Sequence, residues 1–297
     1  MTNQTAVQTG SQSDAAEGGL LLEVKGLTVK FPRSPTGKPA VDDVSISVLN
    51  GQSVGLVGES GSGKSTVCLA VMGLTPPGTK VTGEILFNGV DLLKINEKQY
   101  RTLRGKDIGL IYQDPMAALN PVKTIGAQLR EPLRLHMGMN KKQANDRAVE
   151  LLELVGIADA ADKMRKYPHE FSGGMRQRVV IAMAISCNPK LIIADEPTTA
   201  LDVSVQAQVL DLLQRLTDEF GIALMLVSHD LGVVAGVVDD VAVMRYGKLV
   251  EYGGVRSTFE HPKNDYTKEL LARVREIESG SNLDEPIAES AAVETAS

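Results

Sequence analysis

The spacing of apolar side chains predicts a strand-rich region near the N-terminus. Residues 20–31 alternate between apolar and polar, which is typical of one long strand or a pair of strands, and residues 41–48 behave similarly. Residues 53–57 are mostly apolar, as expected for a short buried strand. A helix is expected from about Ser65 to Met72, closed by the sequence TPPG. Beyond it, the Asn88-Gly89 pair predicts the turn of a hairpin.

Helical spacing replaces this pattern in the middle of the chain. Two amphipathic segments follow Thr124, and in the second of them Ala148, Leu151, Leu152 and Val155 recur on one face of a helix. We therefore expect a helical sub-domain over about residues 114–170.

Helices and strands alternate in the part of the chain that follows. The pattern predicts helices over residues 173–187 and 203–220, strands over residues 191–194 and 222–227, and a helix that begins at Asp230. Such alternation is typical of parallel strands covered by helices. The predicted fold class is α/β, with a mostly parallel sheet, an antiparallel β region near the N-terminus and a helical sub-domain.

Length, composition and charge narrow the classes of function. The 297 residues are expected to form one large domain over residues 20–278, between a polar tail (1–19) and an acidic tail (279–297) that are both predicted to be disordered. A net charge of −6, with 4% aromatic residues and no Trp, argues against nucleic-acid binding. No apolar run is long enough to span a membrane, and no signal peptide is recognised. The two cysteines, Cys68 and Cys187, are expected to be buried thiols.

The sequence GESGSGKST carries the clearest chemical signal. It fits the pattern G-x-x-x-x-G-K-[ST] and lies between a predicted strand and a predicted helix, as a phosphate-binding loop does. Backbone N–H groups and the helix dipole bind phosphate oxygens in such a loop. Lys64 would reach the β- and γ-phosphates, and Ser65 would bind Mg²⁺. The predicted nucleotide-binding residues of the loop are Gly58, Glu59, Ser60, Gly61, Ser62, Gly63, Lys64, Ser65 and Thr66.

Polar residues also end three other predicted strands. The apolar segment LIIADEP ends in Asp195, expected to bind Mg²⁺, and Glu196, expected to orient or deprotonate the attacking water. Gln113 follows the segment IGLIY, where its amide could contact Mg²⁺ or water, and His229 ends IALMLVSHD, where it could contact the γ-phosphate or the water. Because ligands bind at the carboxyl ends of parallel strands, we expect these side chains to meet at the phosphate loop.

The motifs, in this order, closely resemble the ATP-binding subunit of an ABC transporter over residues 20–274. The resemblance includes SGG at residues 172–174 and ALD at residues 200–202. It implies a P-loop NTPase in which two subunits close head to tail on two ATP molecules. It also implies that the sub-domain after Gln113 contacts a membrane-spanning partner. The residues that would contact ATP held by the partner ATPase subunit are Ser172, Gly173, Gly174 and Asp202.

Two local features acquire a meaning from this resemblance. Gly173 and Gly174 are poor residues for the start of a helix, but they would let helix N–H groups approach an anion without a Cβ in the way. Phe31 has two interpretations: it is the aromatic side chain that stacks on adenine, or it is a strand residue packed in the core.

A narrower resemblance leads to the oligopeptide/dipeptide/nickel-type importers. The segments YPHEFSGGMRQRVVIAMAI, ADEPTTALDVSVQAQVLDLL and GKLVEYGGVRSTFEHPKNDYTKELL carry it. Met175 is typical of one of the two different ATPase subunits of these importers. Two differences stand out. Asn264 and Asp265 stand where relatives often have His-Pro. Some relatives hold an iron–sulfur cluster near the C-terminus, and this chain cannot hold it because it has no cysteines there.

The resemblance predicts an ATPase, with ATP and Mg²⁺ as cofactors, that energises import of di- or oligopeptides from the cytoplasmic face of the membrane. The expected partners are a second ATPase subunit, different or identical, two permease proteins and, indirectly, an extracytoplasmic solute-binding protein. Alternatives are import of nickel or another small solute, and a non-transport ABC ATPase. A generic P-loop kinase or GTPase would not explain residues 172–174 together with His229, and no guanine-reading Asn-Lys-x-Asp is present.

Overall fold

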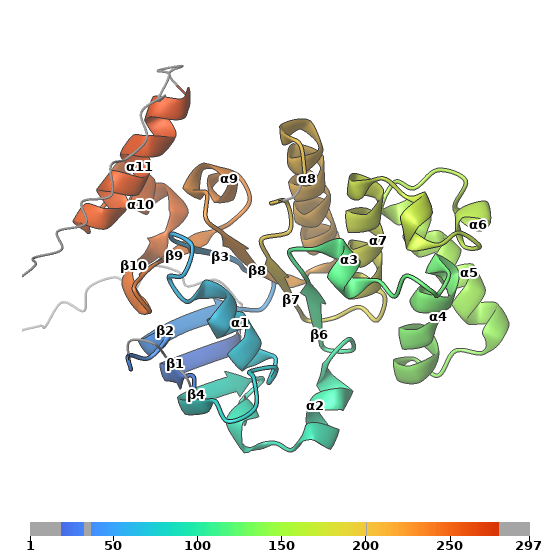
Figure 1. Cartoon of the computed structure of the whole chain (residues 1–297), viewed down its shortest axis with the longest axis horizontal. Coiled ribbons are helices and arrows are strands. Elements are labelled where there is room, and N and C mark those ends of the chain that lie inside the picture. The colour runs from blue at the N-terminus through green and yellow to red at the C-terminus, as the bar shows by residue number, and fades with distance from the viewer. Residues whose placement is uncertain (1–18, 33–36, 200, 279–297) are drawn as a thin grey trace, which may run out of the picture.

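Figure 1 shows the computed structural model of the chain, which describes residues 19–32, 37–199 and 201–278. The two tails expected to be disordered lie outside the described residues, apart from Gly19. Ala200, the first residue of the sequence ALD, also lies outside them.

The described residues form a mixed α/β fold. The helices and strands predicted with bounds are present to within one or two residues, and the structure adds elements over residues 97–103 and 240–278 that were not predicted. The strands are β1 (Leu20–Lys30), β2 (Val41–Leu49), β3 (Ser53–Val57), β4 (Lys80–Phe87), β5 (Val90–Asp91), β6 (Ile108–Ile111), β7 (Leu191–Asp195), β8 (Ala223–Ser228), β9 (Asp240–Arg245) and β10 (Lys248–Gly254). The helices are α1 (Lys64–Val71), α2 (Glu97–Leu103), α3 (Pro115–Ala118), α4 (Ile125–His136), α5 (Lys141–Leu154), α6 (Ala160–Lys163), α7 (Gly173–Ile185), α8 (Val203–Phe220), α9 (Leu231–Ala235), α10 (Val255–Glu260) and α11 (Asp265–Glu278), with 3₁₀ turns η1 (Leu92–Lys94) and η2 (Pro168–Glu170).

The N-terminal strands form an antiparallel sheet in the order β2-β1-β4-β5. Of the two alternatives for residues 20–31, the structure has the single long strand. Its register against β2 shifts between Val24 and Leu27, around Gly26, whose φ is +55°. Asn88 and Gly89 have φ values of +49° and +76°, the pair of positive angles that the tightest hairpin turn requires.

The second sheet positions the site. Its order is β10-β9-β3-β8-β7-β6, and all neighbours are parallel except β10 and β9. Strands β3, β7 and β8 are almost entirely buried, as expected for a parallel sheet covered on both faces. Because β3, β6, β7 and β8 run in the same direction, the segments that follow them leave from one edge of the sheet.

The hydrophobic core has two parts. One joins α1 to strands of both sheets, and the other joins the parallel sheet to α4, α5, α7, α8 and α11. Cys68 lies in the first part of the core, and Cys187 lies two residues after the end of α7. Both cysteines are buried free thiols, as predicted.

Helices α3 to α6 fill most of the region between β6 and α7. The predicted buried face of α5 is confirmed, because Ala148, Leu151, Leu152 and Val155 are all 0% exposed. In Figure 1 these helices lie on the opposite side of the molecule from α10 and α11.

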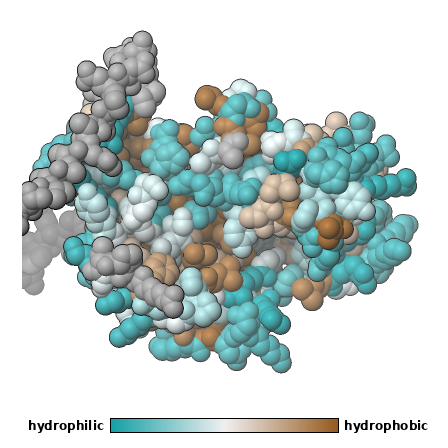
Figure 2. Space-filling model, viewed as in Figure 1, coloured by the Kyte–Doolittle hydropathy of each residue, from teal (hydrophilic) through white to brown (hydrophobic). Residues whose placement is uncertain are grey.

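The surface is mostly hydrophilic in the view of Figure 2, with apolar side chains gathered over α8 and near the middle of the face. Within the described ranges, no helix combines the length and hydropathy needed to cross a bilayer.

Candidate functional site

The loop between β3 and α1 contains three glycines with positive φ, and at two of them neighbouring backbone leaves no room for a side chain. Gly58, Gly61 and Gly63 have φ values of +151°, +78° and +103°. A Cβ at Gly58 would lie 2.1 Å from the carbonyl oxygen of Met244, and a Cβ at Gly63 would lie 2.5 Å from that of Ala40. The curled backbone of the loop therefore depends on its glycines and on the backbone of Met244 and Ala40 that packs against it.

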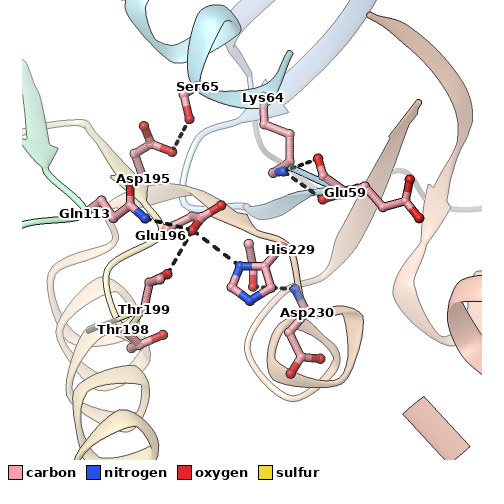
Figure 3. A network of polar contacts seen from close by, with 12 residues as sticks. Glu59, Lys64, Ser65, Gln113, Asp195, Glu196, Thr198, Thr199, His229 and Asp230 are labelled. Carbon is pink, nitrogen blue, oxygen red and sulfur yellow. Dashed lines mark hydrogen bonds and ion pairs between the residues drawn. The ribbon is translucent and has the colours of Figure 1, made fainter. Parts of the chain in front are cut away.

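Lys64 begins α1 and turns its ammonium group back into the loop (Figure 3). Its Nζ donates to the carbonyl oxygens of Gly58 at 2.7 Å and Glu59 at 3.0 Å, and the residue is only 4% exposed. Burial lowers the pKa of Lys64. The Oγ of Ser62 is also buried and has no hydrogen-bond partner among the described residues. A buried cation at the start of a helix fits the phosphate groups of a nucleotide, whose oxygens accept hydrogen bonds from it and from helix N–H groups.

Ser65 and Asp195 lie side by side across the gap between α1 and β7. The Ser65 hydroxyl donates to Asp195 Oδ1 at 2.9 Å. Burial raises the pKa of Asp195, and the hydrogen bond from Ser65 opposes that shift. A hydroxyl and a carboxylate are the hard oxygen ligands that Mg²⁺ takes together with substrate phosphates. The described part of the chain has no cluster of three His, Cys, Asp or Glu residues that could hold a metal ion.

Glu196 is the centre of the polar network in Figure 3. Its Oε2 accepts hydrogen bonds from Gln113 Nε2 at 3.2 Å and Thr199 Oγ1 at 2.9 Å, and His229 Nδ1 lies 3.3 Å away. The Glu196 side chain is 15% exposed, whereas that of His229 is 54% exposed. The ends of β6, β7 and β8 thus deliver their polar residues to one carboxylate, as the order of motifs predicts.

The backbone at Glu196 is unusual for a residue with a side chain. Its φ is +45°, in the left-handed region that non-glycine residues adopt at an energetic cost of about 1 kcal/mol or more. Its N–H donates to the carbonyl oxygen of Val227 at 3.0 Å, which holds this conformation against β8. Strained backbone of this kind is concentrated at functional sites, where it aims a side chain in a direction that regular structure does not offer.

Thr199 is a member of this network that sequence reasoning missed. It lies three residues after Glu196 and gives the shortest hydrogen bond to Oε2. The only signal in the sequence is the Thr-Thr pair that follows LIIADEP, and hydroxyl residues are common in turns for other reasons.

The start of α7 lies apart from these groups. Ser172 is the N-cap, and its Oγ accepts a hydrogen bond from the N–H of Met175 at 3.3 Å. Ser172 and Gly173 are exposed. None of the hydrogen bonds described around Glu196 or Lys64 involves either residue.

The two glycines of this helix start have different structural reasons. A Cβ at Gly174 would lie 2.6 Å from Cγ1 of Val205, so packing of α7 against α8 already requires glycine there. A Cβ at Gly173 would meet only Cδ2 of Leu201, at an ordinary distance of 3.6 Å. Gly174 therefore has a packing reason inside the chain in addition to the predicted approach to an anion, whereas Gly173 has no such packing reason.

Asp202 and Phe31 complete the predicted residues. Asp202 caps α8: its Oδ1 accepts from the hydroxyl of Ser204 at 2.7 Å and from the N–H of Val205 at 3.0 Å, and the hydrogen bond from Ser204 is the main cause that lowers the pKa of Asp202. Phe31 follows β1 directly and is half-buried, which fits either of its two interpretations.

A phosphate loop at the start of α1 and two carboxylates at the end of β7, brought to one edge of a parallel sheet, define the class of P-loop nucleotide-binding proteins. A sequence model described as ABC transporter matches residues 41–199. The chain belongs to the ABC transporter family, as its motifs predict.

Individual relatives agree with this assignment. The chain is 48% identical over 260 residues to the oligopeptide transport ATP-binding protein OppD of Salmonella typhimurium, with 88% of this chain and 78% of the relative covered. It is equally 48% identical over 260 residues to the dipeptide transport ATP-binding protein DppD of Bacillus subtilis, with 87% and 78% covered.

A solved structure extends the agreement to the fold. The dimeric structure of a post-hydrolysis state of the ATP-binding cassette MJ0796, bound to ADP and Pi, has a TM-score of 0.70 and 26% identity. The alignment covers 80% of this chain and 99% of that one. The predicted fold class, an ABC ATPase core, is therefore confirmed.

Proposed function

We propose that this protein is the ATP-hydrolysing subunit that energises an importer of di- or oligopeptides. Its membership of the ABC transporter family supports ATP hydrolysis coupled to transport. The peptide substrate rests on the names of relatives that are 48% identical over most of the chain. The observation that carries the enzymatic part is the convergence of Lys64, Asp195 and Glu196 at one sheet edge, where phosphates, a cation and an attacking water would meet.

The residues of this chain divide the work of hydrolysis. Lys64 and the N–H groups of the loop hold the phosphates. Ser65, Asp195 and Gln113 would hold Mg²⁺, which would neutralise charge on the phosphates. Glu196 orients and deprotonates the attacking water, because its carboxylate is held by three neighbours at the mouth of the loop.

His229 contributes through its position beside that carboxylate. Its Nδ1 faces Glu196, so the rest of its ring can turn towards the γ-phosphate, and its exposed side leaves room for this contact. Phe31 stacks on adenine, in keeping with a half-buried ring.

The second half of each ATP site comes from another subunit. Ser172 and Gly173 are exposed at the N-terminus of a 13-residue helix, where free N–H groups and the helix dipole favour an anion. Asp202 is exposed at the start of α8. In a head-to-tail pair these residues, with Gly174 keeping α7 close to α8, face the phosphate loop of the partner, which is a different ATPase subunit or a second copy.

The membrane partners dock beside the helical region. A cavity of about 520 Å³ opens between β6 and α4, and Tyr112, Leu135 and Met183 are among the side chains that line it. Leu135 is 74% exposed and Tyr112 is 39% exposed, so this cavity presents apolar surface that suits a cytoplasmic segment of a permease protein. Two such permeases and a solute-binding protein on the other side of the membrane complete the importer. The chain acts at the cytoplasmic face of that membrane.

The test is to purify the chain together with its permeases and solute-binding protein and to measure which solute stimulates ATP hydrolysis. Di- or oligopeptides should stimulate phosphate release, and the Glu196→Gln complex should not respond. Stimulation by nickel chelates without a response to peptides would assign another solute, and isolation of the chain with nucleic acid and without membrane proteins would favour a non-transport ABC ATPase.

A further inference from the structure

Glu59, the second residue of the phosphate loop, is engaged at each of its polar groups. Its carbonyl oxygen accepts from Lys64 Nζ at 3.0 Å. Its backbone N–H donates to the hydroxyl of Tyr266 at 3.1 Å, and its Oε1 forms an ion pair with Arg273 Nη1 at 3.2 Å. Tyr266 and Arg273 both belong to α11, more than 200 residues away in the sequence. The C-terminal helix therefore contacts the phosphate loop directly.

The Tyr266 hydroxyl is held in place by the packing of its ring. Tyr266 is 2% exposed, and the guanidinium of Arg245, the last residue of β9, lies 4.3 Å from the ring centroid. Its backbone N–H donates to Asn264 Oδ1 at 2.9 Å, and the Asn264 N–H donates to Glu251 Oε2 at 3.1 Å. The start of α11 is thus anchored to β10, so the hydroxyl presents a fixed acceptor to the loop.

The same helix also contacts the opposite side of the site. Cγ1 of Val274 lies 3.1 Å from the position that a Cβ on Gly232 would occupy, and Gly232 belongs to α9. That helix begins two residues after His229. Figure 1 shows α11 beside α9, on the side of the molecule away from α3 to α6. The C-terminal helix therefore bridges the phosphate loop and the segment that carries His229.

We propose that Tyr266 and Arg273 are positioning residues that hold the phosphate loop in its nucleotide-binding shape, so that α11 sets the affinity of the site. This inference rests on the proposed function, in which the loop binds ATP. A loop that is already ordered loses less conformational freedom when the ligand binds. Without the hydroxyl, the Glu59 N–H loses its acceptor, the loop samples other conformations, and binding must reorder it.

The test compares two tyrosines that each lose one hydroxyl. Tyr266→Phe removes the acceptor of Glu59. Tyr252→Phe is the matched control, because the Tyr252 hydroxyl donates to the carbonyl oxygen of Ser47 at 2.9 Å and makes no contact with the loop. MgADP binding to the full chain is measured by calorimetry, and unfolding temperatures are measured without nucleotide. Tyr266→Phe should weaken MgADP binding about fivefold, the effect of one hydrogen bond, and Tyr252→Phe should leave it unchanged.

Arg273→Gln provides a second variant at the surface, where the side chain is 48% exposed and folding is not at risk. It should weaken MgADP binding about twofold, as expected for an exposed ion pair, and Arg273→Lys should restore it. In the assembled transporter, Tyr266→Phe should raise the KM for ATP, with the loss confined to KM. Each variant is judged against the wild-type chain measured in parallel.

The outcomes separate the two proposals. A wild-type chain that binds no MgADP would contradict the proposed function itself. A wild-type chain that binds MgADP, with Tyr266→Phe and Arg273→Gln binding it equally well or more tightly, would overturn the role of α11 alone. A fall in kcat at unchanged KM would also overturn it, because the hydroxyl would then act on the chemical step.

Discussion

The phosphate loop with its neighbouring carboxylates and the start of α7 differ in how completely one chain builds them. Around the loop, Lys64 is 4% exposed and bound to two carbonyl oxygens, and Glu196 has three polar neighbours. At the start of α7, the Ser172 side chain accepts one long cap hydrogen bond of 3.3 Å, and Gly173 is exposed beside it.

The difference teaches what kind of site each region is. A region whose polar groups already hold one another is organised before any ligand arrives, so its geometry alone indicates chemistry. A helix start whose polar groups face solvent is satisfied by water, and only the proposed function gives it a ligand, the ATP of a partner subunit. The start of α7 also contains a residue whose identity is explained by contacts within the chain, because a side chain at Gly174 would collide with Val205.

The largest effect is expected in the region around the phosphate loop, at Glu196. Glu196→Gln keeps the size of the side chain but removes the base, and ATP hydrolysis by the assembled transporter should fall by about 1,000-fold. Phosphate release measures the rate. Glu219→Gln, an exposed glutamate of α8, is the matched control and should leave it unchanged. Hydrolysis by Glu196→Gln at the wild-type rate would show that another group is the base.

Ser172→Arg tests the start of α7. Blocking this helix start should lower hydrolysis in the paired assembly by about 100-fold, the effect of losing one donor to the reacting phosphate. MgADP binding by the isolated chain, measured by calorimetry, should stay within about twofold. If the isolated chain loses MgADP binding instead, Ser172 serves the fold and the contrast between the two regions disappears.

Adjacent glycines allow a test within the helix start itself. Gly174→Ala places a Cβ 2.6 Å from Val205 and should lower the free energy of unfolding by about 1–3 kcal/mol. Gly173→Ala meets nothing closer than 3.6 Å and should leave stability unchanged or raise it by up to about 1 kcal/mol. Urea unfolding of both variants measures the difference. Equal destabilisation by the two substitutions would contradict the separate reasons given for the two glycines.

The smallest effect is expected from one neighbour of the Glu196 carboxylate. Thr199→Val removes a donor to Glu196 Oε2 while Gln113 and His229 remain, so kcat for ATP hydrolysis should fall about fivefold, as expected for about 1 kcal/mol. Thr79→Val removes a hydroxyl whose hydrogen bond closes a surface turn at Pro76, and it should not alter kcat. An unchanged rate in Thr199→Val would mean that the network does not depend on its shortest hydrogen bond.

The sequence predicts most of this arrangement because the physical signals are local. Glycine spacing, an apolar strand before the loop and polar residues at three strand ends are each legible in short segments, and parallel strands must bring those ends to one edge. The grouping of Gln113, Glu196 and His229 follows from that rule. The left-handed backbone at Glu196 does not, because it depends on the hydrogen bond to Val227 of the neighbouring strand.

Contacts between distant segments could not be predicted in the same way. Tyr266 lies 207 residues from Glu59, and no periodicity links a hydroxyl on α11 to a loop that follows β3. Gly174 carries a packing constraint that is set by where α8 crosses α7. Such residues are determined by tertiary geometry, which leaves no pattern in a single sequence.

Strand β6 has a consequence for how the protein behaves in solution. It stands last in the order of the parallel sheet, and its Gly109 and Leu110 line the cavity beside the exposed Leu135. Its length of four residues limits pairing of the strand edge with another chain, so the exposed apolar side chains beside the cavity are what favours association between identical copies. The chain produced alone should therefore aggregate at lower concentration than the same chain produced together with the permease proteins of the proposed importer.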